Sequence, residues 1–359
     1  MKTEDYFILI LSHKRAKFLK DRTWTMLDKK GSTAKRVIIL SDDDPTIDEY
    51  ENLFGKENLF IFNKEEAERK FHIDLIDCYH GEHCSRKGAV WARNTQYYVA
   101  RKLGYRYFMV MDDDYQDVNV RKLLYKKNGK PYLPLVTYLL GKDNDTGMSV
   151  FDRVCLNYFD ILNSSPWLYL VSFAQTGDYP GGWHTTMVRE EYRFKSMNVF
   201  FCDTEKEVKF GGRTNEDTNE YVLNGSRGQL SLTLHGPVVS QTTTQSDKEG
   251  MTDIYKMFGT YVKSLYTCIQ NPSSCRIGVL GNTFPRIHHN IFWKYAVPCV
   301  LDDKYCKNKP LDYNSEVMKD KIKSDEDGNI IINKKFSYLD NKCEILDNVT
   351  LAKSLEDFF

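Results

Sequence analysis

The sequence predicts an α/β protein with a mainly parallel central sheet. Three observations lead to this prediction. Short, uninterrupted apolar runs have the length and composition of strands that are buried on both faces. Helical stretches separate these runs, and alternation of strands with helices favours a parallel sheet with right-handed crossovers. Two of the runs are followed, at once or after one serine, by triplets of aspartate, and ligands of such sheets bind beyond the carboxyl ends of the strands.

The expected elements alternate along the first third of the chain. Four apolar runs are the expected strands, at residues 6–11, 36–40, 59–62 and 106–111. Residues 13–27 have the pattern of a basic helix that follows the first strand. Residues 86–103 predict a second helix, which Gly104 ends. From residue 141 the pattern becomes irregular and rich in Gly, Thr and aromatic residues.

Composition excludes several classes of protein. The 359 residues are 41% hydrophobic and 13% aromatic, which suits a packed core and excludes disorder. The 50 basic residues balance 50 acidic ones, so a polyanion would have to bind a local patch. Nine cysteines without metal-ligand spacing indicate reduced thiols. The apolar run Phe7–Leu11 is too short for a signal sequence or a membrane span. We therefore expect a cytoplasmic protein that does not bind membranes.

An acidic triplet follows the fourth expected strand. Asp112 and Asp114 are two residues apart, so in extended backbone they would point to the same side. Two carboxylates can hold magnesium or manganese, with a diphosphate supplying further oxygens, and such an ion neutralises a leaving diphosphate. The alternative is a solvated acidic turn. The second triplet, Asp42–Asp44, is better interpreted as a nucleotide-side loop or a plain acidic turn than as a metal site.

The helix before Asp112 adds a second signal. It contains Lys87-Gly88-Ala89-Val90-Trp91-Ala92-Arg93-Asn94. The order of strand, helix, Ala-Arg-Asn, strand and acidic triplet resembles the GT-A glycosyltransferases, in which this helix lies against the nucleotide and the acids form the DxD motif. The resemblance implies a GT-A-type, Rossmann-like sheet and places Arg93 and Asn94 near the uridine and diphosphate of a UDP-sugar. Taken alone, Arg93 could equally be a surface charge.

The resemblance also assigns more distant residues. Ser12 and Arg15 follow the first strand, where the GT-A fold contacts the base and ribose. His235 lies after the expected base helix, where some GT-A enzymes have a third metal ligand; a buried neutral histidine is the alternative. Lys195 and Arg213 are candidates to pair with diphosphate oxygens, although each could be a surface charge. Asp112 counts both as a metal ligand and as part of the donor site.

A second block of residues predicts a general base. Thr214 or Asn215 can cap a helix whose first turn carries Glu216 and Asp217. A carboxylate fixed there could take a proton from an acceptor hydroxyl, and compensation of the helix dipole is the alternative. Gly211-Gly212 suggests close approach of the backbone to a ligand. Many inverting GT-A enzymes carry a Glu-Asp pair at this position, so the resemblance implies that Asp217 is the base, with Glu216 beside it.

Further blocks narrow the family. They include Asn215-Glu216-Asp217-Thr218-Asn219, Gly225-Ser226-Arg227-Gly228 and Gln241-Thr242-Thr243-Thr244-Gln245. From the acidic triplet through these blocks, the chain resembles the TET-associated glycosyltransferases, a group that includes phage DNA-modifying enzymes and the kinetoplastid base J glucosyltransferase; the resemblance covers about residues 6–290. It implies a hexosyl- or pentosyltransferase of EC class 2.4. The implied acceptor is the hydroxymethyl group of 5-hydroxymethylcytosine or 5-hydroxymethyluracil in double-stranded DNA, in a bacteriophage setting.

Two other functions stay open at this stage. One is a glycosyltransferase that modifies a protein or glycan hydroxyl, and the other is a degenerate binding module without activity. The basic stretch Arg121–Lys130 could follow DNA phosphates or could be a solvated hairpin tip. The expected organisation is a nucleotide-sugar-binding half at 1–140, an acceptor and catalytic half at 141–300, and a C-terminal appendage at 301–359.

Overall fold

The computed structural model describes most of the first 296 residues and short pieces beyond them. The described residues are 1–71, 88–121, 124–125, 127–128, 131–132, 135–136, 141–142, 147–175, 195–197, 199–241, 262–280, 285–296, 323–324 and 330–331. The chain divides into two units, Met1–Pro298 and Cys299–Phe359. In the second unit, the antiparallel pair β14 (Lys323–Ser324) and β15 (Ile330–Ile331) is described. The candidate site lies within the first unit.

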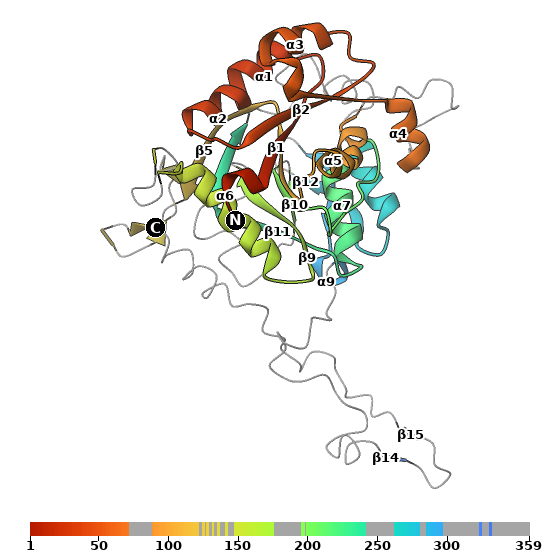
Figure 1. Cartoon of the computed structure of the whole chain (residues 1–359). Coiled ribbons are helices and arrows are strands. Elements are labelled where there is room, and N and C mark those ends of the chain that lie inside the picture. Colours follow the sequence, from red (N-terminus) through yellow and green to blue (C-terminus); the bar gives the residue numbers. More distant parts are fainter. Residues whose placement is uncertain are drawn as a thin grey trace. The chain divides into compact units, whose positions relative to one another are not determined.

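The first unit is built on a nine-stranded sheet with the strand order β3-β2-β1-β4-β10-β9-β11-β5-β8 (Figure 1). Its first four strands are parallel to one another. They are β3 (Leu59–Phe62), β2 (Lys35–Ser41), β1 (Tyr6–Leu11) and β4 (Tyr107–Asp112). These are the four strands that the apolar runs predict, so the α/β fold class is confirmed.

The other half of the sheet mixes strand directions. It consists of β10 (Phe200–Asp203), β9 (Leu168–Gln175), β11 (Leu230–Gln241), β5 (Tyr115–Arg121) and β8 (Leu135–Val136). Strand β10 is antiparallel to both β4 and β9, while β11 runs parallel to β9 and antiparallel to β5. Strands β4 and β5 follow each other in sequence but are separated in the sheet by β10, β9 and β11.

Two helices cover opposite faces of β1, whose six residues are all buried. Phe7, Leu9 and Leu11 pack in one apolar cluster with residues of α5 (Val90–Lys102). On the other face, the Tyr6 ring lies 5.1 Å from that of Phe159 in α6 (Val150–Asn163). Since successive strand residues alternate between faces, a strand buried on both faces must be apolar throughout. The helix predicted over 86–103 is confirmed as α5.

The helix predicted after β1 is present but interrupted. It consists of α1 (Ala16–Leu19), a wider π-helical turn (Lys20–Trp24) and α2 (Thr25–Lys29). The wide turn contains Thr23, whose hydroxyl donates to the Asp112 carbonyl at 2.7 Å and accepts from the Tyr115 amide at 3.0 Å. Such turns occur frequently at functional sites. Here the turn fixes both ends of the link between β4 and β5.

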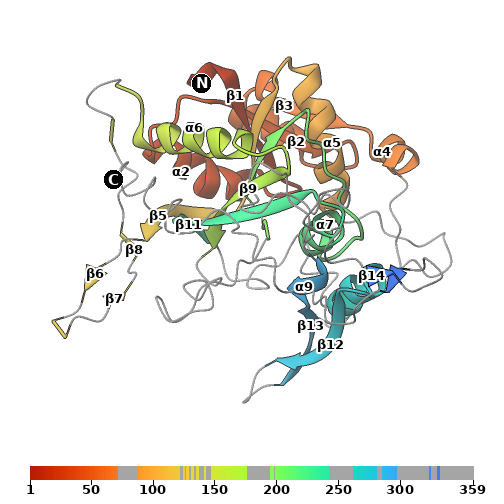
Figure 2. The ribbon, with the colours of Figure 1, turned by 90° about the horizontal axis from the view of Figure 1, so that it is seen from below.

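The remaining elements surround the sheet (Figure 2). The helices are η1 (Thr3–Asp5), α3 (Ile47–Phe54), η3 (Lys56–Asn58), α4 (Lys64–Phe71), α7 (Glu216–Gly225), residues 262–270 and α9 (Trp293–Ala296). Strands β12 (Cys275–Leu280) and β13 (Arg286–Ile291) form a separate antiparallel ribbon below α7 and α9 in Figure 2. Within the described part of the chain, no helix is long and apolar enough to cross a membrane.

The basic stretch Arg121–Lys130 falls only partly on described residues. Its backbone forms part of a hairpin between β6 (Leu124–Tyr125) and β7 (Pro131–Tyr132), with an exposed turn at Lys127 and Asn128. Most of its side chains lie outside the described residues. A hairpin was one of the two interpretations of this stretch; its contact with DNA phosphates remains a prediction.

Candidate active site

The acidic triplet forms the turn between β4 and β5. Strand β4 ends at Asp112, Asp113 and Asp114 form the turn, and β5 begins at Tyr115. The backbone is therefore not extended through Asp114, and the argument that alternation directs Asp112 and Asp114 to one side is wrong. The three carboxylates have separate environments.

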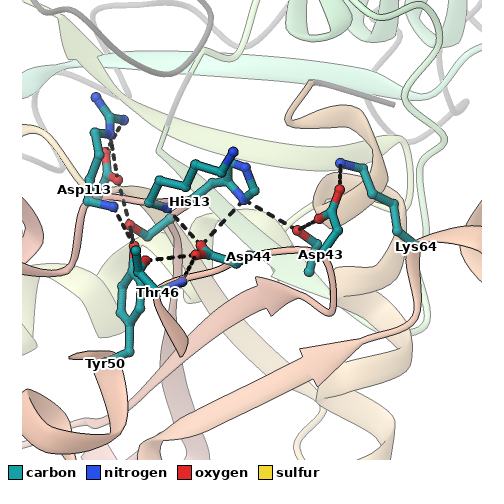
Figure 3. A network of polar contacts seen from close by, with 11 residues as sticks. His13, Asp43, Asp44, Thr46, Tyr50, Lys64 and Asp113 are labelled. Carbon is teal, nitrogen blue, oxygen red and sulfur yellow. Dashed lines mark hydrogen bonds and ion pairs between the residues drawn. The ribbon is translucent and has the colours of Figure 1, made fainter. Parts of the chain in front are cut away.

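Asp113 is a buried structural carboxylate. It accepts hydrogen bonds from the Ser12 hydroxyl at 2.6 Å, from Arg15 Nε at 3.1 Å and from Arg15 Nη2 (Figure 3). Burial raises the pKa of Asp113 to about 6, against the opposing charge of Arg15. The hydroxyl of Ser12 and the guanidinium of Arg15 therefore hold Asp113, and contact of Ser12 and Arg15 with the base and ribose remains a prediction.

Asp112 shares a buried ion pair with Arg93. Arg93 Nη2 donates to Asp112 Oδ1 at 2.7 Å, and the guanidinium carbon lies 4.7 Å from the centre of the Phe200 ring. Arg93 is only 2% exposed, so the surface-charge alternative is wrong. Its Nε and Nη1 are buried without a hydrogen-bond partner among the described residues. Burial raises the pKa of Asp112, although the Arg93 charge lowers it.

Asp114 has an unsatisfied oxygen. Its Oδ1 is buried and has no hydrogen-bond partner in the described part of the chain. Burial, followed by the charges of Asp112 and Asp113, raises the pKa of Asp114 to about 7. An unsatisfied carboxylate oxygen beside two other carboxylates suits a divalent cation, since the cation would offset the repulsion. Asp112 and Asp114 therefore fit as metal ligands.

The protein contributes few ligands beyond these two. The described residues contain no group of three His, Cys, Asp or Glu side chains placed to hold a metal ion. A bound diphosphate would then have to complete the coordination. His235 lies in β11, where the register with β9 shifts between Leu234 and Val238. Its side chain is outside the described residues, so its role as a metal ligand remains a prediction.

Helix α7 begins at Glu216, as the sequence predicts, but its cap differs. Asn215 occupies the N-cap position with φ 56°, and its side chain makes no capping bond. Its Nδ2 instead donates to the Lys263 carbonyl at 3.0 Å and to Thr267 Oγ1 at 3.1 Å. Thr214 Oγ1 is buried without a partner among the described residues. Neither residue caps the helix with its side chain, because Asn215 is drawn towards residues 262–270.

The two acids of α7, Glu216 and Asp217, interact electrostatically with the ion pair of Arg93 and Asp112. Asp217 Oδ1 accepts from the Thr218 amide at 2.7 Å, which fixes the carboxylate. Burial and the charge of Asp217 raise the pKa of Glu216 to about 7, while Arg93 lowers it. The negative charges of Asp112, Glu216 and Asp217 all raise the pKa of Arg93 against the effect of its burial. The charges of acids from β4 and α7 thus act on the same buried guanidinium.

Asn94 and the glycine pair have structural roles. Asn94 Nδ2 donates to the Phe210 carbonyl at 2.9 Å, and Asn94 Oδ1 accepts from the Phe210 amide at 3.0 Å. Both polar atoms of the Asn94 side chain are thus bonded to the backbone, and its position near the nucleotide remains a prediction. A Cβ on Gly212 would lie 2.8 Å from Asn219 Nδ2 and 2.9 Å from Gln270 Nε2. The close approach at Gly212 is therefore to the protein itself and not to a ligand.

Arg213 and Lys195 complete the predicted donor residues. Arg213 is buried beside the start of α5, where a Cβ on Gly88 would lie 3.1 Å from Arg213 Cγ. Lys195 is half-buried, with Nζ 3.9 Å from Met197 Sδ. Arg213 therefore lies close to the helix that carries Arg93, and it is not the surface charge of the alternative interpretation. Contact of either residue with a diphosphate remains a prediction.

The second acidic triplet is occupied by protein partners (Figure 3). Asp44 accepts from the Lys14 amide at 2.7 Å and from the Thr46 amide at 2.8 Å. Asp43 accepts from Lys64 Nζ at 3.0 Å. Lys14 has φ 59°, so Asp44 holds the loop after β1 in a left-handed conformation. These bonds agree with the interpretation of Asp42–Asp44 as an acidic turn.

Sequence reasoning missed the polar network that supports the site. Tyr50, Thr23 and Glu220 carry no recognisable pattern, because each bonds to a residue in another segment of the fold. Glu220 on α7 is buried and accepts hydrogen bonds from Asn224 Nδ2 at 3.2 Å and from the hydroxyl of Ser231 in β11. Burial raises its pKa to about 8. Glu220 therefore joins α7 to the sheet as a protonated carboxyl group at neutral pH.

Glu220→Gln is expected to flatten the pH dependence of stability. Between pH about 4.5 and 8 the unfolded chain releases the Glu220 proton while the folded chain keeps it, so stability falls as pH rises. The variant cannot ionise and should lose that decline, as denaturant unfolding at several pH values would reveal. Glu66→Gln, an exposed position on α4, is the control. If stability falls equally with rising pH in Glu220→Gln and in the wild type, Glu220 is not the protonated group that we assign.

Comparisons with solved structures find weakly similar proteins. Glucosyl-3-phosphoglycerate synthase from Mycobacterium tuberculosis, solved with Mn²⁺, UDP and glucosyl-3-phosphoglycerate, is 9% identical and covers 83% of this chain and 89% of its own, with a TM-score of 0.38. Residues 1–349 of S. aureus TarS are 11% identical and cover 73% and 65%, with a TM-score of 0.34. At these values the likeness supports no statement about activity. Among curated proteins, none matches the sequence.

One comparison concerns the family. The sequence pattern of the family described as TET-Associated Glycosyltransferase matches residues 6–250. The matched range contains β1, the acidic turn, α5 and α7, and ends before the β12–β13 ribbon.

Proposed function

Because this chain belongs to the TET-associated glycosyltransferase family, we propose that it transfers a sugar from a UDP-sugar to the hydroxymethyl group of 5-hydroxymethylcytosine or 5-hydroxymethyluracil in DNA. Family membership makes it a glycosyltransferase. The UDP-sugar donor, the divalent ion, the DNA acceptor and inversion at the sugar are parts of the proposal. A bacteriophage setting would suit such DNA modification.

The observation that best supports the proposal is the grouping of acids around Arg93. Asp112 binds Arg93 directly, and the charges of Glu216 and Asp217 act on the same guanidinium. A donor diphosphate and an acceptor hydroxyl need separate groups, a cation site for the first and a base for the second. Strand β4 offers the cation site and α7 offers the base, so both halves of the reaction meet at Arg93.

We assign the proton of the acceptor hydroxyl to Asp217. The hydroxymethyl oxygen attacks the anomeric carbon, a new C–O bond forms, and the bond from that carbon to the diphosphate oxygen breaks with UDP as the leaving group. Attack from the face opposite UDP would invert the anomeric configuration. The bond from the Thr218 amide holds Asp217 Oδ1, which orients the carboxylate towards one acceptor position. Glu216 lies beside it and contributes negative charge.

The donor side relies on the turn after β4. A divalent ion on Asp112 and Asp114 would supply positive charge to the leaving diphosphate. Arg93 orients Asp112 through its 2.7 Å bond, and Thr23 fixes the backbone on both sides of the turn. Arg213 and Lys195 are the candidates for direct pairing with diphosphate oxygens. His235 would be a third protein ligand to the ion.

A panel of UDP-sugars and acceptors tests the proposed function. The protein is incubated with UDP-glucose, UDP-galactose or UDP-arabinose and with plain or hydroxymethylated duplex DNA, and the nucleosides are analysed by mass spectrometry. We expect the mass of one sugar on the hydroxymethylated nucleoside only. Transfer to a protein or glycan acceptor, with hydroxymethylated DNA unmodified by every donor, would favour the alternative acceptor and overturn the proposal.

A further inference from the structure

The chain contains a long basic segment outside the range that matches the family. Between Ile254 and Leu301 the sequence has five Lys or Arg residues and no Asp or Glu, in a protein whose formal net charge is zero. The β12–β13 ribbon lies inside this segment. A protein without overall charge meets a polyanion through such a local excess of cations.

The ribbon has a basic polar face and an apolar face. Side chains alternate along each strand, so Arg276, its partner Asn290 and Arg286 lie on the same face. Both arginines and Asn290 are exposed. Among the described residues, no carboxylate forms an ion pair with either arginine. A Cβ on Gly278 would lie 2.1 Å from Asn290 Nδ2, so the missing side chain lets Asn290 lie across the ribbon.

The ribbon is anchored next to the candidate base. His289 Nδ1 lies 3.3 Å from Nδ2 of Asn215, the residue that precedes Glu216 and Asp217. The Ser264 hydroxyl donates to the Ile287 carbonyl at 3.4 Å, and the Trp293 ring stacks on that of Tyr221 in α7 at 5.8 Å. These contacts fix the base of the ribbon to the helix that carries Asp217, so a molecule held by the ribbon lies beside the acceptor position.

We propose that the β12–β13 ribbon binds the acceptor duplex in its major groove, with Arg276 and Arg286 on phosphates or base edges. The inference rests on the proposed function, since it names the surface that holds the DNA. A two-stranded ribbon fits the major groove of B-DNA, and arginine and asparagine are common partners of guanine and adenine there. The 5-substituent of a pyrimidine projects into the same groove, so the ribbon and the sugar acceptor share one side of the duplex.

The opposite face of the ribbon offers a competing occupant. Ile277, Val279 and Ile287 are exposed there, Val279 to 71%. Exposed apolar side chains could pair with a second copy of the chain. The absence of acidic residues across the segment favours DNA, because the segment offers no carboxylate that could pair with the arginines of a second copy.

The test compares two double variants that remove equal charge. Arg276→Gln/Arg286→Gln removes the ribbon arginines, and Lys29→Gln/Lys56→Gln removes two exposed lysines from other elements. Affinity for a hydroxymethylated 20-base-pair duplex is measured at several salt concentrations. Since each phosphate contact contributes a log–log slope of about 0.9, the ribbon variant should lose up to about 1.8 from the slope. Its KM for DNA should rise, and the lysine variant should keep the wild-type slope and KM.

The outcomes separate this inference from the proposed function. Equal slopes and equal KM values for DNA in the two variants, with sugar transfer to DNA intact in the wild type, would overturn the ribbon assignment alone. If the salt slope falls in the arginine variant but the wild type transfers no sugar to DNA, the ribbon assignment stands and the acceptor assignment is overturned. A dimer in sedimentation that dissociates in Val279→Asp, with equal salt slopes for the two double variants, would assign the ribbon to self-association and overturn the inference.

Discussion

Asp217→Asn is expected to lower the turnover of sugar transfer by about 10²–10⁴-fold, the usual cost of losing a general base. Asparagine keeps the oxygen that accepts from the Thr218 amide, so the start of α7 should keep its shape. The amide cannot accept the proton of the acceptor hydroxyl. The dissociation constant for UDP-sugar should change little, because the base acts on the acceptor. Single-turnover kinetics together with calorimetry of donor binding would separate the two effects.

Glu216→Gln is the matched control for the base, because Glu216 is the neighbouring acid in the same first turn of α7. It should reduce turnover much less than Asp217→Asn does. An Asp217→Asn enzyme within a few-fold of wild type would contradict the assignment. A large loss in Glu216→Gln with activity retained in Asp217→Asn would transfer the role to Glu216.

Excess chelator is expected to abolish sugar transfer, and Asp114→Asn should come close to the same loss. A bound cation would give the unpartnered Oδ1 of Asp114 a ligand bond, and it would favour the ionised form of a carboxyl group whose pKa is raised. Added Mn²⁺ should raise the Tm of the wild type, because a ligand that binds only the folded state stabilises it. In Asp114→Asn that Tm increase should be much smaller, which gives a measure of binding independent of activity.

Without metal, Asp114→Asn should change the pH dependence of stability. Between pH about 4 and 7 the unfolded chain ionises Asp114 while the folded chain holds its proton, so wild-type stability should fall as pH rises. Asp114→Asn removes that decline. Asp160→Asn, at an exposed position on α6, should leave both the Mn²⁺ response and the pH profile at wild-type values. Full transfer in excess chelator would exclude the metal from the reaction.

The sequence is informative where a pattern is local. Strands β1 to β4 are continuous apolar runs, so their positions followed from hydropathy, and α5 and α7 began close to their predicted residues. Asp112 was selected because it ends a strand and begins an acidic triplet, whereas the resemblance to GT-A glycosyltransferases selected Arg93 and singled out Asp217 at the start of a helix. The structure places these three residues within the same electrostatic environment.

The sequence is less informative where a side chain bonds to a distant segment. Ser12 and Arg15 were assigned to the nucleotide, but a carboxylate 98 to 101 positions later takes their hydrogen bonds. Asn94 was assigned in the same way and instead binds the backbone of Phe210. Local pattern shows that a polar residue stands at a strand or helix end. It does not show which of several polar partners that residue will meet in the fold.

The strand order of the sheet has a consequence for how the chain folds. The acidic turn joins β4 to β5, yet β5 pairs with β11 and β8 while β10, β9 and β11 lie between it and β4. During synthesis, β5 emerges long before the residues of β11 that it pairs with. Pairings between such distant segments form slowly and leave strand edges exposed meanwhile. Strand β5 therefore completes its pairing only after Gln241 has been synthesised, so the part of the sheet that follows the acidic turn is assembled late.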